Sequence, residues 1–200
     1  MAGYTAIAEV SQTLLEVIRS EIEHREDIVS LDGDHVALVD PDEVSLDDDT
    51  RLSLSLYHLE ENASMKNSHP RQRTDPNVAA GAPLGVDLYY LVTAHPGGDD
   101  STAQTLEAQR VLGLALQTFH DNAILDDEQL TEELEADGPL TVSLVNQSLD
   151  ERTNRWSTAP ETAFQPSVIY HVSSACIDSR KREELTPVTE RETAVDRRPE

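Results

Sequence analysis

The chain has 200 residues, which is enough for one domain with a sizeable apolar core. Its 15 basic and 39 acidic residues give a net charge of −24, so we expect neither nucleic acid nor an anionic membrane surface as a general partner. No apolar run of about 18 residues is present, and we therefore expect no membrane-spanning helix.

Lys66 and Lys181 are the only lysines among the 15 basic residues. So acidic a chain with so little lysine is typical of a salty cytosol, where salt at about 1 M screens charges beyond about 3 Å. The alternative is an acidic, partly disordered protein, which the strongly periodic segments described below disfavour. The N-terminus lacks the basic and apolar regions of a signal peptide, so we expect a cytoplasmic protein.

The spacing of apolar residues predicts both helices and strands. Steps of three and four run from Ile7 to Ile22 and from Ala108 to Phe119, as on one face of a helix. Strict alternation is clearest at 52–58, as in a half-buried strand. In chain order we expect a helix at 5–24, strands at 35–39 and 51–62, a long mobile loop at 63–83, a strand at 86–93, a turn at 95–98, a helix at 101–119, a short acidic helix at 126–136, a strand at 140–146, a helix from 148 to 159 and a strand at 167–178.

This order of elements predicts the fold class. Links of hairpin length are rare, and helices lie between several of the strands. We therefore expect an α/β (α+β) fold in which helices pack on a mixed β-sheet. A single domain would cover residues 1–178, and a charged, proline-dotted tail would cover 179–200. Such a tail should be disordered alone in solution unless a partner holds it.

Catalytic and metal-binding patterns are not found in the sequence. The seven histidines show no HxH or HExxH spacing, and the single cysteine, Cys176, lies in an apolar strand where a buried, inert thiol is expected. Gly97-Gly98 precedes a helix, but Asp99 and Asp100 follow at once and oppose a bound phosphate. No GxSxG serine motif is present. We expect no cofactor, no metal and no enzymatic activity.

Partner contacts are the more promising interpretation of several side chains. Basic residues gather in the 63–83 loop and just after the last strand, against an acidic background. The second group is either a solubilising tail or a docking site for an acidic partner, and both readings stay open. Aromatic residues are typical anchors of cores and interfaces. The candidate interface residues are Lys66, Arg71, Arg73, Tyr57, Trp156, Arg180, Lys181 and Arg182.

Four segments, in this order, carry a resemblance to a known family. They read LSLSLYHLEENASMKN, PLGVDLYYLVTAHP, QRVLGLALQTFHDNAIL and LTVSLVNQSLDERTNRWSTAPETAFQPSVIYHVSSACID. Their most specific pieces are Leu56-Tyr57 with Asn62 and Asn67 beyond them, the strand Asp87–Leu91, and Trp156 followed by Ser167–Tyr170. Over about Tyr4 to Asp178 the chain resembles the tail-terminator, or cap, proteins of phage-tail-like contractile injection systems.

The resemblance implies a structural role in an injection particle assembled in the cytoplasm. Such proteins form a ring, expected to be hexameric, that ends the inner tube and anchors the last sheath layer. The implied partners are other copies of the chain, the sheath protein and the inner tube protein, with residues 179–200 as the expected sheath contact. The extreme charge matches a particle from a halophilic archaeon. The alternative is a soluble adaptor for particle assembly or effector loading, and an uncharacterised hydrolase is disfavoured because no nucleophile–base pattern is present.

Overall fold

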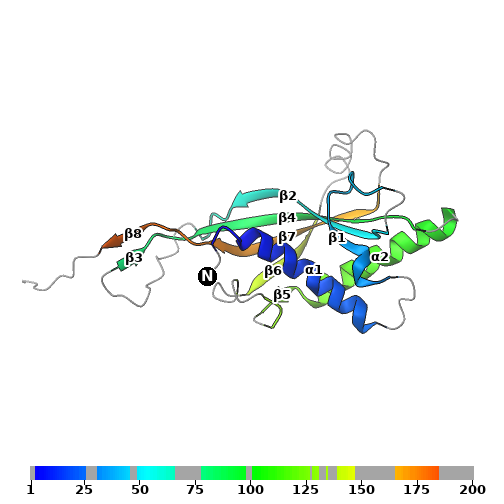
Figure 1. The fold of residues 1–200 in the computed structure, drawn as a ribbon, viewed down its shortest axis with the longest axis horizontal. Coiled ribbons are helices and arrows are strands. Elements are labelled where there is room, and N and C mark those ends of the chain that lie inside the picture. Colours follow the sequence, from blue (N-terminus) through cyan, green and yellow to red (C-terminus); the bar gives the residue numbers. More distant parts are fainter. Residues whose placement is uncertain are drawn as a thin grey trace, which may run out of the picture.

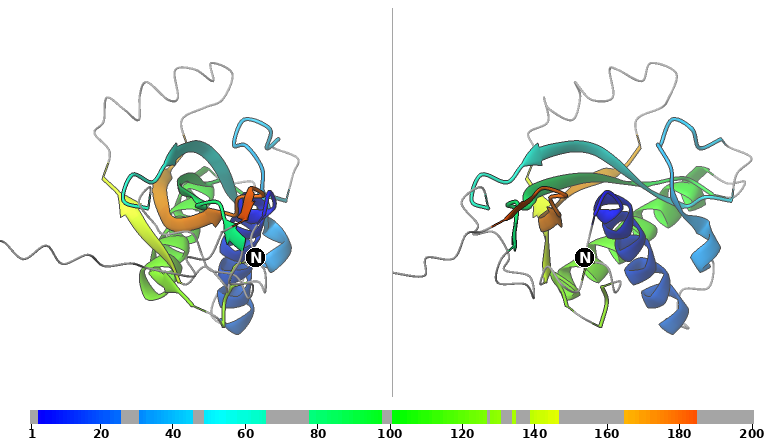
Figure 2. Two further views of the ribbon diagram at one scale, coloured as in Figure 1. Left: turned by 90° about the vertical axis from the view of Figure 1, so that its left-hand side faces the viewer. Right: turned by 60° about the vertical axis from the view of Figure 1, so that its left-hand side comes forward.

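The structure is a computed structural model that describes residues 3–25, 31–45, 49–65, 78–97, 101–126, 128–130, 134, 139–146 and 165–184. Two long helices lie on one face of a curved β-sheet, and a narrow two-stranded ribbon extends away from this body (Figures 1 and 2). The elements are α1 (Ala6–His24), a 3₁₀ turn (Gly33–His35), β1 (Val36–Leu38), β2 (Leu52–Glu61), β3 (Val78–Ala80), β4 (Leu84–Ala94), α2 (Ser101–Asp121), β5 (Ile124–Leu125), β6 (Leu140–Val145), β7 (Ser167–Ile177) and β8 (Arg182–Glu184).

The predicted fold class, helices packed on a mixed sheet, is confirmed. The main sheet has the strand order β1-β2-β4-β7-β6-β5. Only β1 and β2 run parallel, and every other neighbouring pair is antiparallel. The two longest ladders join β2 to β4 and β4 to β7, so β4 lies at the centre of the sheet between two partners of similar length.

The core lies between this sheet and the two helices. Val10, Leu14 and Ile18 recur along one face of α1 and are fully buried, as the helical spacing requires. On β4 every second residue faces the helices, so Leu88 and Val92 are fully buried against them. From α2 the core receives apolar side chains at three- and four-residue steps, namely Ala108, Val111, Leu114, Ala115 and Phe119.

Two strands leave the main sheet together and form the ribbon, which we call the arm (residues 78–84 and 177–184). In the arm β3 pairs antiparallel with β8, and the amide of Gly81 donates to the carbonyl of Lys181 at 2.9 Å. At its root the β4–β7 ladder continues from Leu84 opposite Ile177. A Cβ at Gly81 would lie 2.6 Å from the Ser179 hydroxyl, so this position needs glycine to let the two strands approach.

Most predicted elements are confirmed, with shifts at their ends. The loop predicted at 63–83 is wrong in its last part, because β3 forms there by pairing with a strand about a hundred residues later in the chain. The acidic helix predicted from 126 is wrong at its start, where residues 128–130 form a turn stabilised by the amides of Gln129 and Leu130 donating to the carbonyl of Asp126. The helix predicted at 148–159 lies outside the described residues. Cys176 is buried, as predicted.

The sheet and α1 are joined by a hydrogen bond between two side chains. The Tyr90 hydroxyl lies 2.7 Å from Ser11 Oγ, which donates its own proton to the carbonyl of Ile7. Tyr90 is fully buried, and burial raises the pKa of its phenol to about 12, although the bond to Ser11 acts in the opposite direction. The phenol is therefore neutral and donates to Ser11.

We predict that Tyr90→Phe lowers the free energy of unfolding by about 1 kcal/mol, because it removes a buried neutral hydrogen bond without leaving a cavity. Tyr170→Phe is the matched control, since Tyr170 is equally aromatic and buried on β7 but makes no described side-chain hydrogen bond. Urea denaturation at one salt concentration measures both variants. Equal losses would show that the bond to Ser11 is not what stabilises the layer contact.

Candidate partner interface

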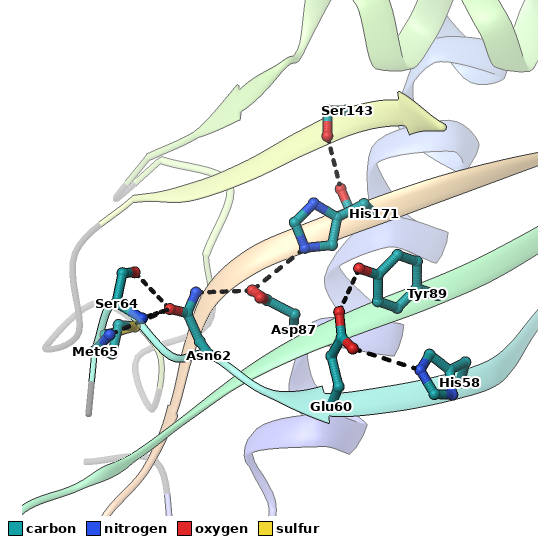
Figure 3. Close-up of polar contacts among 9 residues, drawn as sticks. All are labelled: His58, Glu60, Asn62, Ser64, Met65, Asp87, Tyr89, Ser143 and His171. Atoms are coloured by element: carbon teal, nitrogen blue, oxygen red, sulfur yellow. Dashed lines mark hydrogen bonds and ion pairs between the residues drawn. The ribbon is translucent and has the colours of Figure 1, made fainter. Parts of the chain in front are cut away.

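A row of rings crosses the face of the sheet that is turned away from the helices. His58 on β2 stands opposite Tyr89 on β4, which stands opposite His171 on β7. The ring centres of His58 and Tyr89 are 5.3 Å apart, and those of Tyr89 and His171 are 4.8 Å apart and stacked. Figure 3 shows the row running across three neighbouring strands. The row lies at the surface of a strongly acidic protein, with Tyr89 and His171 stacked on each other and the His58 side chain about half exposed.

Carboxylates flank this row, and the first is Glu60 at the outer side of β2. One of its oxygens accepts a hydrogen bond from the Tyr89 hydroxyl at 2.7 Å, and the other lies 3.8 Å from Nε2 of His58. The Glu60 carboxylate, together with partial burial, raises the pKa of Tyr89 to about 12. The side chains of His58 and Glu60 are each about half exposed, at 53% and 52%, so this pair remains accessible.

Asp87 is the second carboxylate, and it lies deeper on β4. It accepts a hydrogen bond from the Asn62 amide at 2.9 Å and lies 3.3 Å from Nε2 of His171. The latter distance is that of an ion pair, but the angle leaves this nitrogen without a hydrogen bond among the described residues. Figure 3 shows Asn62, Asp87 and His171 pointing toward one another from three segments. We call His58, Glu60, Asp87, Tyr89 and His171 the acidic–aromatic patch.

The turn after β2 holds one end of this patch. Asn62 Oδ1 accepts hydrogen bonds from the amides of Ser64 and Met65, at 3.0 and 3.2 Å, which closes the turn on its own side chain. Met65 then packs against the backbone of Gly85, where a Cβ would lie only 2.6 Å from the Met65 Cβ. Asn62 therefore fixes both the turn and the position of the Asp87 carboxylate.

At the other end of the same sheet face lies a buried histidine. His95 follows β4, is 6% exposed, and has its Nε2 2.8 Å from Ser53 Oγ. Burial, reinforced by the positive charge of Arg51, lowers the pKa of His95 to about 4. The Arg51 guanidinium packs against Gly97, where a Cβ would displace the end of this side chain. His95 is thus a neutral structural group that joins the ends of β2 and β4.

An acidic hollow of about 240 Å³ lies elsewhere, between α1 and the segment after α2. Glu16, Glu21 and Glu128 line it, and its amide groups bond to each other, since Gln129 Nε2 donates to Asn122 Oδ1 at 2.7 Å. The carboxylates oppose an anionic ligand.

The residues predicted from the sequence as partner contacts fall in different parts of the chain. Tyr57 lies on β2 where the register shifts, with its ring 6.3 Å from that of Tyr89, so it borders the patch. Arg180, Lys181 and Arg182 lie on the arm and are exposed. Lys66, Arg71, Arg73 and Trp156 lie outside the described residues.

The patch itself was not predicted. Its rings and carboxylates come from three strands that are far apart in the sequence, and none forms a recognisable motif. The sequence did indicate that polar residues such as Asp87 and Tyr89 lie on one face of the strand predicted at 86–93. Only the strand order and register could bring them to His58 and His171.

The patch offers charged and aromatic groups that can bind a partner. Within the described residues neither His58 nor His171 is hydrogen-bonded to a hydroxyl or thiol, and Ser143 Oγ bonds instead to the backbone carbonyl of His171 at 3.5 Å. Among the residues that the structure describes, no three His, Cys, Asp or Glu side chains lie close enough together to hold a metal ion. None of the described helices is long and apolar enough to cross a membrane.

The chain shares its fold with two solved structures. Over its whole length the chain superposes on the sheath/tube terminator of the PVC extracellular contractile injection system in its extended state, with a TM-score of 0.64 and 16% identity. Over 93% of its length it superposes on the tube-terminating cap of the anti-feeding prophage, with a TM-score of 0.57 and 18% identity. The chain spans 66% and 60% of the lengths of those two chains.

The chain belongs to the Pvc16 N-terminal domain family, whose sequence profile it matches over residues 9–191. The resemblance to tail-terminator proteins predicted from the sequence is thereby confirmed. No curated protein matches the chain by sequence.

We predict that His95 makes stability fall in mild acid. Its pKa is about 6.5 when unfolded and about 4 when folded, so its neutral form stabilises the fold fully above pH 6.5, and this contribution is lost as the pH falls toward 4. The slope contributed is at most about 1.4 kcal/mol per pH unit.

The measurement is urea denaturation of the wild type and of His95→Gln at steps from pH 7 to pH 4.5, at constant salt. Glutamine can still bond to Ser53 but does not titrate. The difference in unfolding free energy between the two proteins should shift in favour of the variant as the pH falls. A difference that stays constant over this range would contradict the assignment of a neutral buried imidazole.

Proposed function

We propose that this chain is the terminator of a contractile injection particle. It forms a ring, expected to be hexameric, that ends the inner tube and anchors the last sheath layer. The observation that carries this proposal is the superposition of the whole chain on a sheath/tube terminator, together with the family match over most of its length. The particle is assembled in the cytoplasm, and the protein acts as a structural component rather than as an enzyme.

The shape of the molecule supports this role. A ring needs two different surfaces on each subunit, because each copy must bind the next one head to tail. The compact body and the projecting arm supply surfaces of different character (Figure 1). The sheath contact was expected at residues 179–200, and we propose it for the part after Glu184, which lies outside the described residues. The alternative, a soluble adaptor for assembly or effector loading, would leave no copies in the finished particle.

Electron microscopy of particles carrying a tag on this chain separates the two functions. A terminator should be present in fixed stoichiometry at the particle end opposite the baseplate, and its deletion should give tubes of uncontrolled length. An adaptor should be missing from purified particles, and its deletion should leave the tube length unchanged.

We predict that association of the subunits requires salt. With a net charge of −24 each, two copies repel one another over about 10 Å at 0.1 M salt but over only about 3 Å at 1 M. Mass photometry of the purified protein should show rings in molar salt and monomers at about 0.1 M. Rings that form equally well at both salt concentrations would contradict this prediction.

A further inference from the structure

The arm carries three consecutive cations, Arg180, Lys181 and Arg182, with Asp178 before them and Glu183 and Glu184 after them in the sequence. Arg180, Lys181 and Arg182 are all exposed, and no acidic side chain among the described residues lies within ion-pair distance of them. Two arginines in and just after α1 differ from these, because both have partners. Arg25 pairs with Glu21, and Arg19 donates to the carbonyl of Val36. In a chain with 39 acidic residues, a run of three exposed cations without an ion pair to any described side chain is available to bind another surface.

The acidic–aromatic patch has the chemistry that binds such cations. An arginine side chain favours a ring face beside a carboxylate, because it can stack on the ring while donating hydrogen bonds to the carboxylate oxygens. The patch presents Glu60 next to the rings of His58 and Tyr89, and Asp87 lies behind them. Its carboxylates are already oriented by Tyr89 and Asn62, which reduces the entropy lost on binding.

The arm cannot reach the patch of its own molecule. Lys181 is hydrogen-bonded to Gly81, and Glu60 lies opposite Asp87 in the β2–β4 ladder. Gly81 and Asp87 belong to one continuous stretch of chain. From Gly81 to Asp87 the chain is largely extended, which corresponds to a separation of about 20 Å. The paired ribbon also continues the sheet outward rather than folding back (Figure 1). The cations and the patch can therefore meet only between molecules.

We propose that the basic segment of the arm, Arg180–Arg182, docks on the acidic–aromatic patch of a second copy of this chain. This inference rests on the proposed ring and identifies its subunit contact. Each copy has one arm and one patch that cannot satisfy each other internally, so the contact is head to tail and closes into a ring when the rotation allows. An isolated two-stranded ribbon is marginally stable in water, and docking would stabilise it.

Salt weakens the overall repulsion between subunits more than it weakens this contact. At about 1 M salt, charges more than about 3 Å apart are screened, whereas charges in direct contact still attract. Salt thus removes the repulsion between whole subunits and leaves the arm–patch contact in place.

The first experiment compares charge reversals by mass photometry in molar salt. Lys181→Glu should weaken ring formation at least about tenfold. Arg110→Glu, the same charge change at an exposed position on α2, should change it less than about twofold. Combining Lys181→Glu with Glu60→Lys restores an opposite pair and should recover rings, whereas combining it with Glu43→Lys at an exposed loop position should not.

The second experiment tests proximity directly. A Lys181→Cys, Glu60→Cys double variant, treated with a short bis-maleimide, should give a ladder of covalent oligomers that ends at the ring. Each single variant should stop at dimers, and Cys176 is buried and should not react.

Two results would overturn the inference while leaving the terminator function intact. Rings formed by both the wild type and Lys181→Glu, with no ladder from the double-cysteine variant, would show that another surface joins the subunits. If Lys181→Glu still forms rings but does not occupy particle ends, the arm binds the sheath or tube instead. If the wild type gives no rings and the double-cysteine variant gives no ladder at high concentration, the subunit contact is overturned. The presence or absence of the chain at particle ends then decides the proposed function separately.

Discussion

The antiparallel ladder between β4 and β7 is the interaction on which the other parts of the molecule depend. On the helix side of this ladder Leu88 pairs with Val172, and both are fully buried in the core. On the opposite side Tyr89 pairs with His171, which forms the centre of the acidic–aromatic patch. Beyond Leu84 and Ile177 the same two segments leave the body as the arm. One pairing register therefore sets the core, the patch and the arm together.

The charge of −24 limits how such a molecule can associate. Long-range attraction between copies is not available to it, so specificity has to come from groups in direct contact. The described structure concentrates rings, oriented carboxylates and unpaired cations in two small regions, while the hollow beside α1 is lined by glutamates. The proposed contact between copies would act only after salt has removed the general repulsion.

The sequence predicted the elements with strong periodicity and missed those that depend on distant pairing. The helix at 5–24 and the strands beginning near Leu52 and Ser167 were predicted because their apolar spacing is local information. β3 and β8 were missed, since three residues each carry no pattern and form only because the β4–β7 ladder brings them together. The patch was missed for the same reason, whereas the basic run at Arg180–Arg182 was visible in the sequence as a contrast in charge.

The alignment of the arm with the β4–β7 ladder has a mechanical consequence. A force that pulls on the arm along its length acts parallel to the strands it continues. The hydrogen bonds from β4 to β2 and from β7 to β6 then carry the load together in shear, rather than opening one after another as they would if the strands were peeled apart. Because β4 also pairs with β2 along most of its length, the load spreads across the middle of the sheet. The arm is thus anchored in the direction in which a β-sheet resists extension best.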